Sequence, residues 1–261
     1  MVIESEDGMP GENSETLTTI ENAFEILEWV LSNSGATPAQ IANQLDVSTS
    51  TAHRYLNTLS EEGYLVREDR TYYLALKFLA LGEQARTRKE TYVSAEEYTH
   101  MLAEESGCRS TFIVEEGGRG IYLYTAPGKH SVWTRSTIGK RIPLHATAGG
   151  KALLAFLPQE KVDRIIKTGL ERQTAETITS PQRLRETIET IRERGYAFNR
   201  EEQIDGVNAV GAPVMSDGGD VIGAFSVSGP SNRLRGDRFT DELPQILLGI
   251  TNEYELRVSL S

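Results

Sequence analysis

The sequence predicts an α+β protein with two domains, in which a linker helix joins an N-terminal winged helix-turn-helix domain to a C-terminal α/β domain. Three observations support this prediction. Two short amphipathic helix patterns flank a tight turn near the N-terminus, and a β-hairpin pattern follows them directly. The later sequence alternates helix patterns with pairs of strands, in a chain whose 261 residues exceed the usual length of one domain.

The helix-turn-helix pattern lies between Thr37 and Gly63. Thr37 can cap a short helix that has Pro38 at its first position. After a turn at Asp46 to Ser48, a second helix pattern carries apolar residues on one face and uncharged polar and basic residues on the other. Such a second helix enters the major groove of DNA. We therefore expect DNA contacts from the following residues: Thr37, Ser48, Thr49, Ser50, Thr51, His53, Arg54 and Asn57.

A predicted wing strengthens the DNA-binding interpretation, because two amphipathic helices alone are common and their polar faces are usually only solvated. The β-rich runs 64–67 and 71–74 flank a polar turn, 68–70. Arg67 and Arg70 lie where wings contact phosphates. A first helix completes the domain, and the domain is expected over residues 16–78. The apolar residues of this helix that we expect to face the core are Ile20, Ala23, Phe24, Leu27, Val30 and Leu31.

The charge of the chain argues against nucleic-acid binding, because the net charge is −11 and a basic surface is the usual footprint. Residues 1–15 hold five acids and neither Lys nor Arg, and we expect them to be disordered. Residues 16–78 hold eight acids and four basic residues, but no acid lies within 47–59. We interpret the excess of acidic residues as a halophilic adaptation to a cell with high internal salt. At high salt, counterion release adds little to DNA binding.

The composition predicts a cytoplasmic protein without membrane association. No apolar run approaches the 18 or so residues of a membrane span, and the N-terminus lacks the pattern of a signal peptide. Cys108 is the only cysteine, which excludes an intramolecular disulfide and a multi-cysteine metal site. We expect no cofactor.

Residues 79–261 are expected to form the linker helix and the second domain. The helical pattern of Lys77 to Thr91 turns strongly polar, which is typical of an interdomain linker. The strand patterns that follow are 110–116, 120–125, 208–215 and 220–228. The helix patterns are 92–107, 146–157, 158–169, 180–195 and a final amphipathic helix around 243–254.

Three segments give the chain a specific resemblance: GKALLAFLP (150–158), GYAFNREEQIDGVNAVGAPV (195–214) and GAFSVSGPSNR (223–233). Together with the winged helix, they resemble the IclR family of transcriptional regulators from about Thr16 to the C-terminus. The resemblance implies a GAF-like effector-binding domain with a small-molecule pocket facing its loops. It also implies a homodimer or homotetramer that binds a double-stranded DNA operator.

The strand pattern 220–228 predicts an effector site. Ser226 and Ser228 project from one face of the strand, while Phe225 and Val227 project from the other. Paired hydroxyls suit a small organic acid, although serines on a sheet can equally bond to their neighbours. The resemblance favours the ligand, because effector contacts of the family match both serines.

The resemblance carries four further positions into the predicted effector site: Ala148, Gly149, Asn199 and Ala209. Backbone amides near the start of a helix, here at Ala148 and Gly149, can hold an anionic group. Asn199 replaces an acidic residue of the family and Ala209 replaces a frequent cysteine. Both departures remove titratable groups, so the effector of other members cannot be carried over.

An enzyme with a helical N-terminal appendage is the alternative interpretation, and the sequence gives it little support. Residues 149–151 lack the first glycine and the final Ser/Thr of a phosphate-binding loop. Ser228 and His145 lack the G-x-S-x-G pattern of a hydrolase. His100 and His130 show no metal-ligand spacing with His145. We therefore expect no catalytic residues and no metal site.

Overall fold

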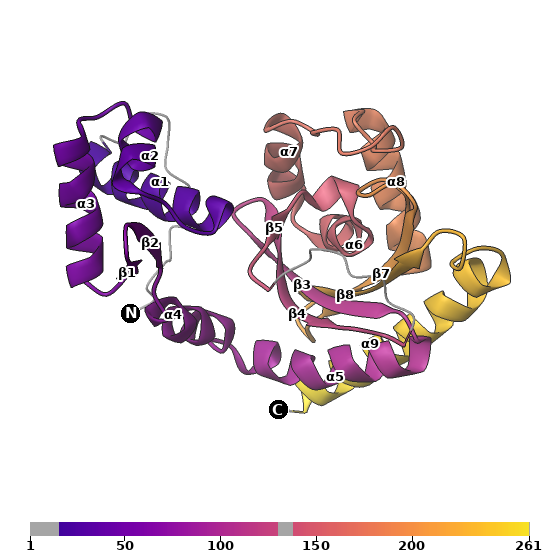
Figure 1. Ribbon diagram of the computed structural model, residues 1–261. Helices are drawn as coiled ribbons and strands as arrows, with labels where there is room; N and C mark the ends of the chain where they lie inside the picture. The colour runs from indigo at the N-terminus through magenta and orange to yellow at the C-terminus, as the bar shows by residue number, and fades with distance from the viewer. Residues whose placement is uncertain (1–15, 130–137, 261) are drawn as a thin grey trace, which may run out of the picture. The chain divides into compact units, whose positions relative to one another are not determined.

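The computed structural model describes residues 16–129 and 138–260 (Figure 1). The predicted acidic tail, 1–15, and His130 lie outside these residues. The chain forms two compact units, one extending to Ala85 and the other beginning at Arg86. We had placed the boundary after Phe78, and the first unit thus includes most of the helix that follows the wing.

The first unit contains the predicted helix-turn-helix and wing. Its elements are α1 (Thr18–Asn33), α2 (Pro38–Gln44), α3 (Thr49–Glu61), β1 (Leu65–Glu68), β2 (Thr71–Leu74) and α4 (Lys77–Arg86). Thr37 caps α2 by accepting a hydrogen bond from the amide of Gln40, and Pro38 is the first residue of that helix. Asp46 takes the left-handed conformation, with φ of 51°, in the turn before α3. The local sequence signals for these boundaries are confirmed.

The prediction for the inner face of α1 was largely wrong. Ile26 and Val30 are the buried residues of this helix. Ile20, Phe24 and Leu31, which we had assigned to the core, are 50%, 63% and 62% exposed. Apolar residues cover more than one side of α1, so helical periodicity alone does not determine which side faces the core.

The second unit is built on a six-stranded sheet in which every neighbouring pair is antiparallel, in the order β5-β4-β3-β8-β7-β6. The strands are β3 (Arg109–Glu116), β4 (Arg119–Ala126), β5 (Arg141–Ile142), β6 (Ala197–Arg200), β7 (Val207–Met215) and β8 (Val221–Pro230). The helices are α5 (Glu90–Ser106), a 3-10 turn (Leu144–Ala146), α6 (Ala148–Phe156), α7 (Gln159–Lys167), α8 (Pro181–Arg194), a π-helical turn (Arg238–Glu242) and α9 (Leu243–Ser259).

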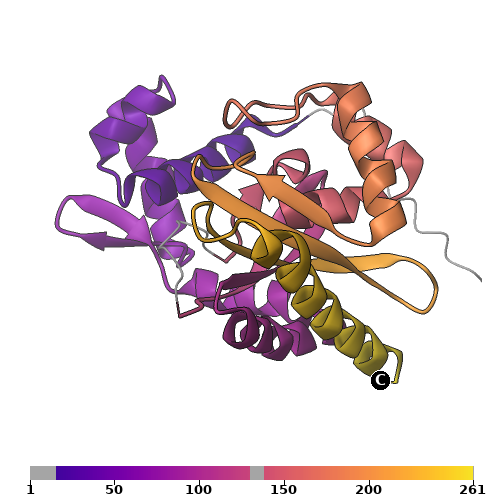
Figure 2. The same cartoon turned by 90° about the vertical axis from the view of Figure 1, so that its right-hand side faces the viewer.

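Helices cover both faces of this sheet, with α5 and α9 on one side and α6 to α8 on the other (Figures 1 and 2). The alternation of side chains along the strands produces two separate cores. Phe112 and Phe225 join the core under α5 and α9, whereas the neighbouring Ile113 and Ala224 join the core under α6 to α8. The predicted opposition of Phe225 and Ser226 is therefore confirmed, and Ser226 lies on the α6 side.

The short strands β5 and β6 were not predicted. β5 has two residues and β6 has four, which is too short for a clear alternation of apolar and polar residues. Within the described part of the chain, no helix has the length and apolar character needed to cross a bilayer.

Candidate DNA-binding surface and effector pocket

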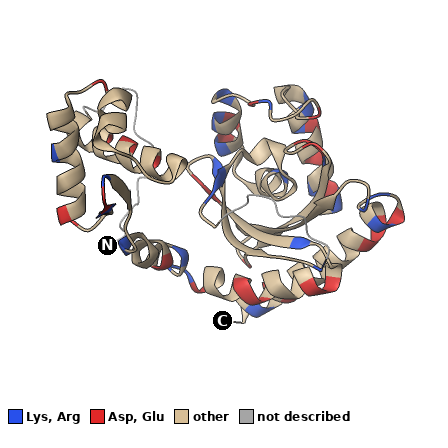
Figure 3. Ribbon diagram, viewed as in Figure 1, with Lys and Arg blue, Asp and Glu red and all other residues tan. Residues whose placement is uncertain are grey.

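Helix α3, the predicted recognition helix, presents an exposed polar stripe. Ala52 and Leu56 are fully buried on its inner face. Ser50, His53, Arg54 and Asn57 are exposed, at the spacing that places them on one side of a helix. Figure 3 shows few charges on α3, whose only acid, Glu61, is its last residue. The stripe therefore offers hydrogen-bond donors and acceptors without repelling phosphate.

Three of the predicted DNA contacts also have local structural roles. The Ser48 hydroxyl caps α3 by accepting a hydrogen bond of 3.1 Å from the Thr51 amide, and it lies 2.9 Å from the Thr51 hydroxyl. Thr37 and Gln40 form a reciprocal capping box at α2. Thr49 is exposed at the first turn of α3. DNA contacts from these residues remain a prediction.

Both arginines of the predicted wing, Arg67 and Arg70, are exposed. The strands pair so that Arg67 lies opposite Tyr72 and Glu68 opposite Thr71. The Arg67 side chain donates through Nε to the carbonyl of Asp69, at 2.8 Å, and so follows the hairpin turn. Arg70 is exposed at the end of that turn.

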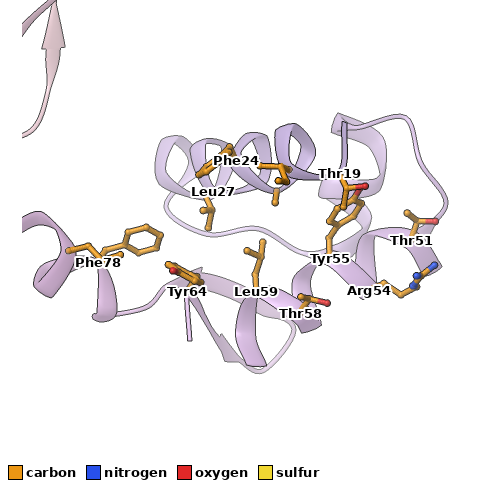
Figure 4. A pocket seen from close by; sticks show the side chains of 13 residues that line it. Thr19, Phe24, Leu27, Thr51, Arg54, Tyr55, Thr58, Leu59, Tyr64 and Phe78 are labelled. Atoms are coloured by element: carbon orange, nitrogen blue, oxygen red, sulfur yellow. The ribbon is translucent and has the colours of Figure 1, made fainter. Parts of the chain in front are cut away.

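An apolar groove runs between α1, α3 and α4 (Figure 4). Its volume is about 760 Å³. The groove includes Phe24 and Leu27 of α1, Leu59 of α3 and Phe78 of α4. In Figure 4 the Arg54 guanidinium extends away from these side chains. Sequence analysis missed the groove because it assigned the apolar side of α1 to the core.

The second unit contains a pocket on the α6 side of the sheet. It brings together five of the six predicted effector residues: Ala148, Asn199, Ala209, Ser226 and Ser228. Gly149 is adjacent, since a Cβ placed there would lie 3.5 Å from the Cβ of Ser226. The remaining lining residues are Thr111, Ile113, Tyr122, Thr147, Gln203, Ile204 and Val207. These residues were not predicted from the sequence. Thr111, for example, enters the pocket because β3 pairs with β8 and places it opposite Ser226, and no local signal reveals that pairing.

The pocket is almost closed, with a free volume of about 30 Å³. The start of α6 packs directly on β7, because a Cβ on Gly211 would lie 2.5 Å from the Gly149 nitrogen. The space is enough for about one water molecule. An organic ligand must therefore displace part of the wall.

Asn199 supports the wall of the pocket through both ends of its amide. Nδ2 donates to the carbonyl of Ala146 at 2.5 Å, and Oδ1 accepts from the amide of Glu202 at 3.0 Å. The side chain is 3% exposed. This neutral residue therefore lines the pocket while its polar atoms join the 3-10 turn before α6 to the segment after β6.

A buried ion pair fixes the same wall. The ammonium of Lys151, which is 1% exposed, donates to both carboxylate oxygens of Glu202. Burial lowers the pKa of Lys151, and the Glu202 carboxylate opposes this shift. The carbonyl of Glu202 accepts from the Thr177 hydroxyl at 2.6 Å. Because Gln203 and Ile204 follow Glu202, the pair anchors the segment that closes the pocket.

No lysine, arginine, histidine, aspartate or glutamate is among the described residues that line the pocket. His145 lies in the buried turn before α6, where its Nε2 is 3.0 Å from the carbonyl of Glu171. Burial lowers the pKa of His145. Within residues 16–129 and 138–260, no group of three His, Cys, Asp or Glu side chains is arranged to hold a metal.

Two family profiles match the chain. One, described as the IclR helix-turn-helix domain, matches residues 19–69, and the other, described as the C-terminal part of the bacterial transcriptional regulator IclR, matches residues 84–253. The chain belongs to the IclR family. It is therefore a DNA-binding transcriptional regulator. The helix α4 lies largely between the two matched segments.

Known IclR regulators resemble this one over nearly its whole length. A probable HTH-type transcriptional regulator, ArcR of Halobacterium salinarum, is 34% identical over 93% of this chain and 94% of its own. The crystal structure of Thermotoga maritima IclR shares 28% identity, with a TM-score of 0.77 over 93% of this chain and 99% of that one. An IclR homologue of Microbacterium hydrocarbonoxydans, complexed with 4-hydroxybenzoate, shares the fold, with a TM-score of 0.81 at 21% identity over 93% of this chain and 100% of that one.

Proposed function

We propose that this regulator binds a double-stranded DNA operator through α3 and the wing, and that a small organic acid in the effector pocket modulates its operator affinity. The observation that carries the proposal is the meeting of Ser226, Ser228 and the start of α6 in one pocket. The residues proposed to contact DNA are Thr37, Ser48, Thr49, Ser50, Thr51, His53, Arg54, Asn57, Arg67 and Arg70.

A carboxylate fits the donors that the pocket offers. The hydroxyls of Thr111, Ser226 and Ser228 can donate to it, and backbone amides at the start of α6 favour negative charge. Because the lining contains no cationic side chain, these neutral donors would carry the recognition. The 4-hydroxybenzoate complex of the Microbacterium homologue supports a carboxylate ligand. To regulate, the acid must bind the states of high and low DNA affinity with different strengths.

We also propose that two copies associate through the apolar groove of the first unit, in a homodimer or homotetramer. The exposed apolar side chains of α1 and the groove beside them suit a self-complementary contact. Replacing Phe24 with Glu should reduce the mass measured by sedimentation, whereas Glu28→Gln on the same helix should not. An unchanged mass for Phe24→Glu would exclude this interface.

We further propose a regulatory role in the cytoplasm, without catalysis. The described pocket residues include no cysteine, lysine, arginine, histidine, aspartate or glutamate. The net charge of −11 supports adaptation to high salt. We expect the protein to need molar salt to stay folded and its DNA affinity to fall only gently with salt. Full stability in dilute buffer would contradict the halophilic interpretation.

A mobility-shift titration with the DNA upstream of the gene tests the proposal. The protein should shift this fragment at concentrations that leave an unrelated fragment of equal length free. Equal binding to both fragments would contradict a specific operator there.

A further inference from the structure

Tyr72 contacts three parts of the first unit: the helix α3, the opposite wing strand β1 and the segment before α2. It lies in the second wing strand, β2, and is 1% exposed. Its hydroxyl donates to Oδ1 of Asn57 on the recognition helix, at 3.2 Å. Its ring lies 5.7 Å from the guanidinium carbon of Arg67 on the opposite wing strand. One buried side chain therefore contacts both α3 and a wing arginine.

The backbone of Tyr72 fixes the wing to the segment before α2. The amide of Tyr72 donates to the carbonyl of Ala36 at 2.8 Å, and the amide of Ala36 donates back at 2.9 Å. The adjacent Gly35 has φ of 124°, and a Cβ there would lie 2.7 Å from the ring of Tyr73. The close approach allowed by this glycine holds β2, and Tyr72 with it, in a defined position.

This contact determines how Asn57 is presented to DNA. An asparagine that pairs with adenine donates from Nδ2 to N7 and accepts from N6 at Oδ1. Here Oδ1 already accepts from Tyr72, while Asn57 itself is exposed on the polar stripe of α3. Tyr72 occupies one of the two acceptor positions of Oδ1 and so fixes the orientation of the amide, and the amide nitrogen is the group that we expect to meet DNA. It can donate to N7 of either purine, to guanine O6, to thymine O4 or to a phosphate oxygen.

We propose that Tyr72 is a positioning residue for operator recognition, which orients Asn57 to donate to an acceptor group of DNA and fixes the wing against the recognition helix. The inference rests on the proposed function, because it concerns contacts to the same operator. It adds the chemical class of the group that Asn57 reads.

The test uses the full chain and DNA selected by the wild-type protein from a random duplex library. Tyr72→Phe keeps the buried ring and removes the hydroxyl, so the variant should fold and unfold like the wild type. Its affinity for the selected DNA should fall by about three- to tenfold, the loss expected from one misplaced hydrogen bond. Tyr73→Phe, the same change at the next residue, should leave the affinity unchanged.

A second selection, with Tyr72→Phe, separates the two acceptors. If Asn57 reads a base, the released amide can bond to both N7 and N6 of adenine, and adenine should become more frequent at one base position. If Asn57 contacts a phosphate, affinity should fall equally for all selected sequences. In either case the double variant Tyr72→Phe/Asn57→Ala should bind no more weakly than Asn57→Ala alone, because Tyr72 acts through Asn57.

Wild-type affinity and base preference in Tyr72→Phe would overturn this inference while leaving the proposed function intact. Additive losses in the double variant would also overturn it, because they would show that Tyr72 does not act through Asn57. A wild-type protein that enriches no sequence would instead overturn specific operator binding, and the inference with it.

Discussion

The two units of this regulator hold their proposed recognition groups in opposite ways. In the DNA-binding unit, the polar stripe of α3 is exposed and the residues beneath it, Ala52 and Leu56, are apolar and buried. In the effector unit, Ser226 and Asn199 are 6% and 3% exposed, inside a pocket that is almost closed. The proposed effector contacts are therefore also buried parts of the fold, whereas most of the proposed DNA contacts on α3 project from its exposed face.

The largest effect is expected when the buried Lys151–Glu202 ion pair beside the closed pocket is broken. Lys151→Met leaves the Glu202 carboxylate buried without its partner and should lower the free energy of unfolding of the effector unit by about 3–5 kcal/mol. Urea denaturation followed by far-UV circular dichroism measures this loss. Arg185→Met removes an ion pair of 2.5 Å between exposed side chains, which water screens, and should change the free energy of unfolding far less. Equal losses in the two variants would contradict the shared role of the buried pair.

Sequence signals located the elements that short segments determine. Thr37 with Pro38, and Ser180 with Pro181, start α2 and α8 as expected, and Gly107 and Gly195 end α5 and α8 in the left-handed conformation. Each of these signals acts within one turn of backbone, so it can be identified without knowledge of the fold.

The features missed in the pocket and on α1 depend on distant partners. A lysine at position 151 gives no sign of burial, because its partner Glu202 lies 51 residues away. Thr111 enters the pocket only through its pairing with Ser226. The apolar side of α1 that faces the core is chosen by packing against the rest of the unit. The family resemblance, and not periodicity, placed Ala148, Asn199 and Ala209 near the serines.

The next largest effect is expected on ligand binding in the pocket of the effector unit. Ser226→Ala with Ser228→Ala should weaken a bound carboxylate by about 1.5–3 kcal/mol for each lost hydrogen bond. Isothermal titration calorimetry, with a carboxylic acid that raises the wild-type melting temperature, measures this loss. Ser231→Ala, beyond the end of β8 and outside the pocket lining, is the control and should bind normally. Wild-type affinity in the double variant would place the ligand elsewhere.

A smaller effect is expected at the exposed surface of the other unit. Thr49→Ala with Arg54→Ala should reduce operator affinity at least tenfold, because each contact to a base edge contributes about 1–3 kcal/mol. Since both side chains are exposed, the free energy of unfolding should not change. Fluorescence anisotropy with labelled operator and urea denaturation give the two values. A loss of stability equal to the loss of binding would break the distinction between the two units.

The smallest effect is a pH dependence confined to the effector unit. Burial lowers the pKa of His145 in the folded state, so the unfolded chain takes up its proton first as the pH falls. The unit should be fully stable above the unfolded pKa of about 6.5 and lose stability below it. His145→Gln should reduce the slope of unfolding free energy against pH between about 6.5 and 5. An unchanged slope would show that His145 does not contribute to it.

The most direct test of the account measures operator affinity with and without the bound acid, for the wild type and for Ser226→Ala/Ser228→Ala. For the wild type, saturating acid should change the dissociation constant by about fivefold or more, which corresponds to a coupling free energy of about 1–3 kcal/mol. For the double variant, operator affinity without the acid should equal that of the wild type, and the acid should no longer change it. A double variant that still responds at the wild-type concentration, or a wild type whose operator affinity is indifferent to the bound acid, would contradict the account.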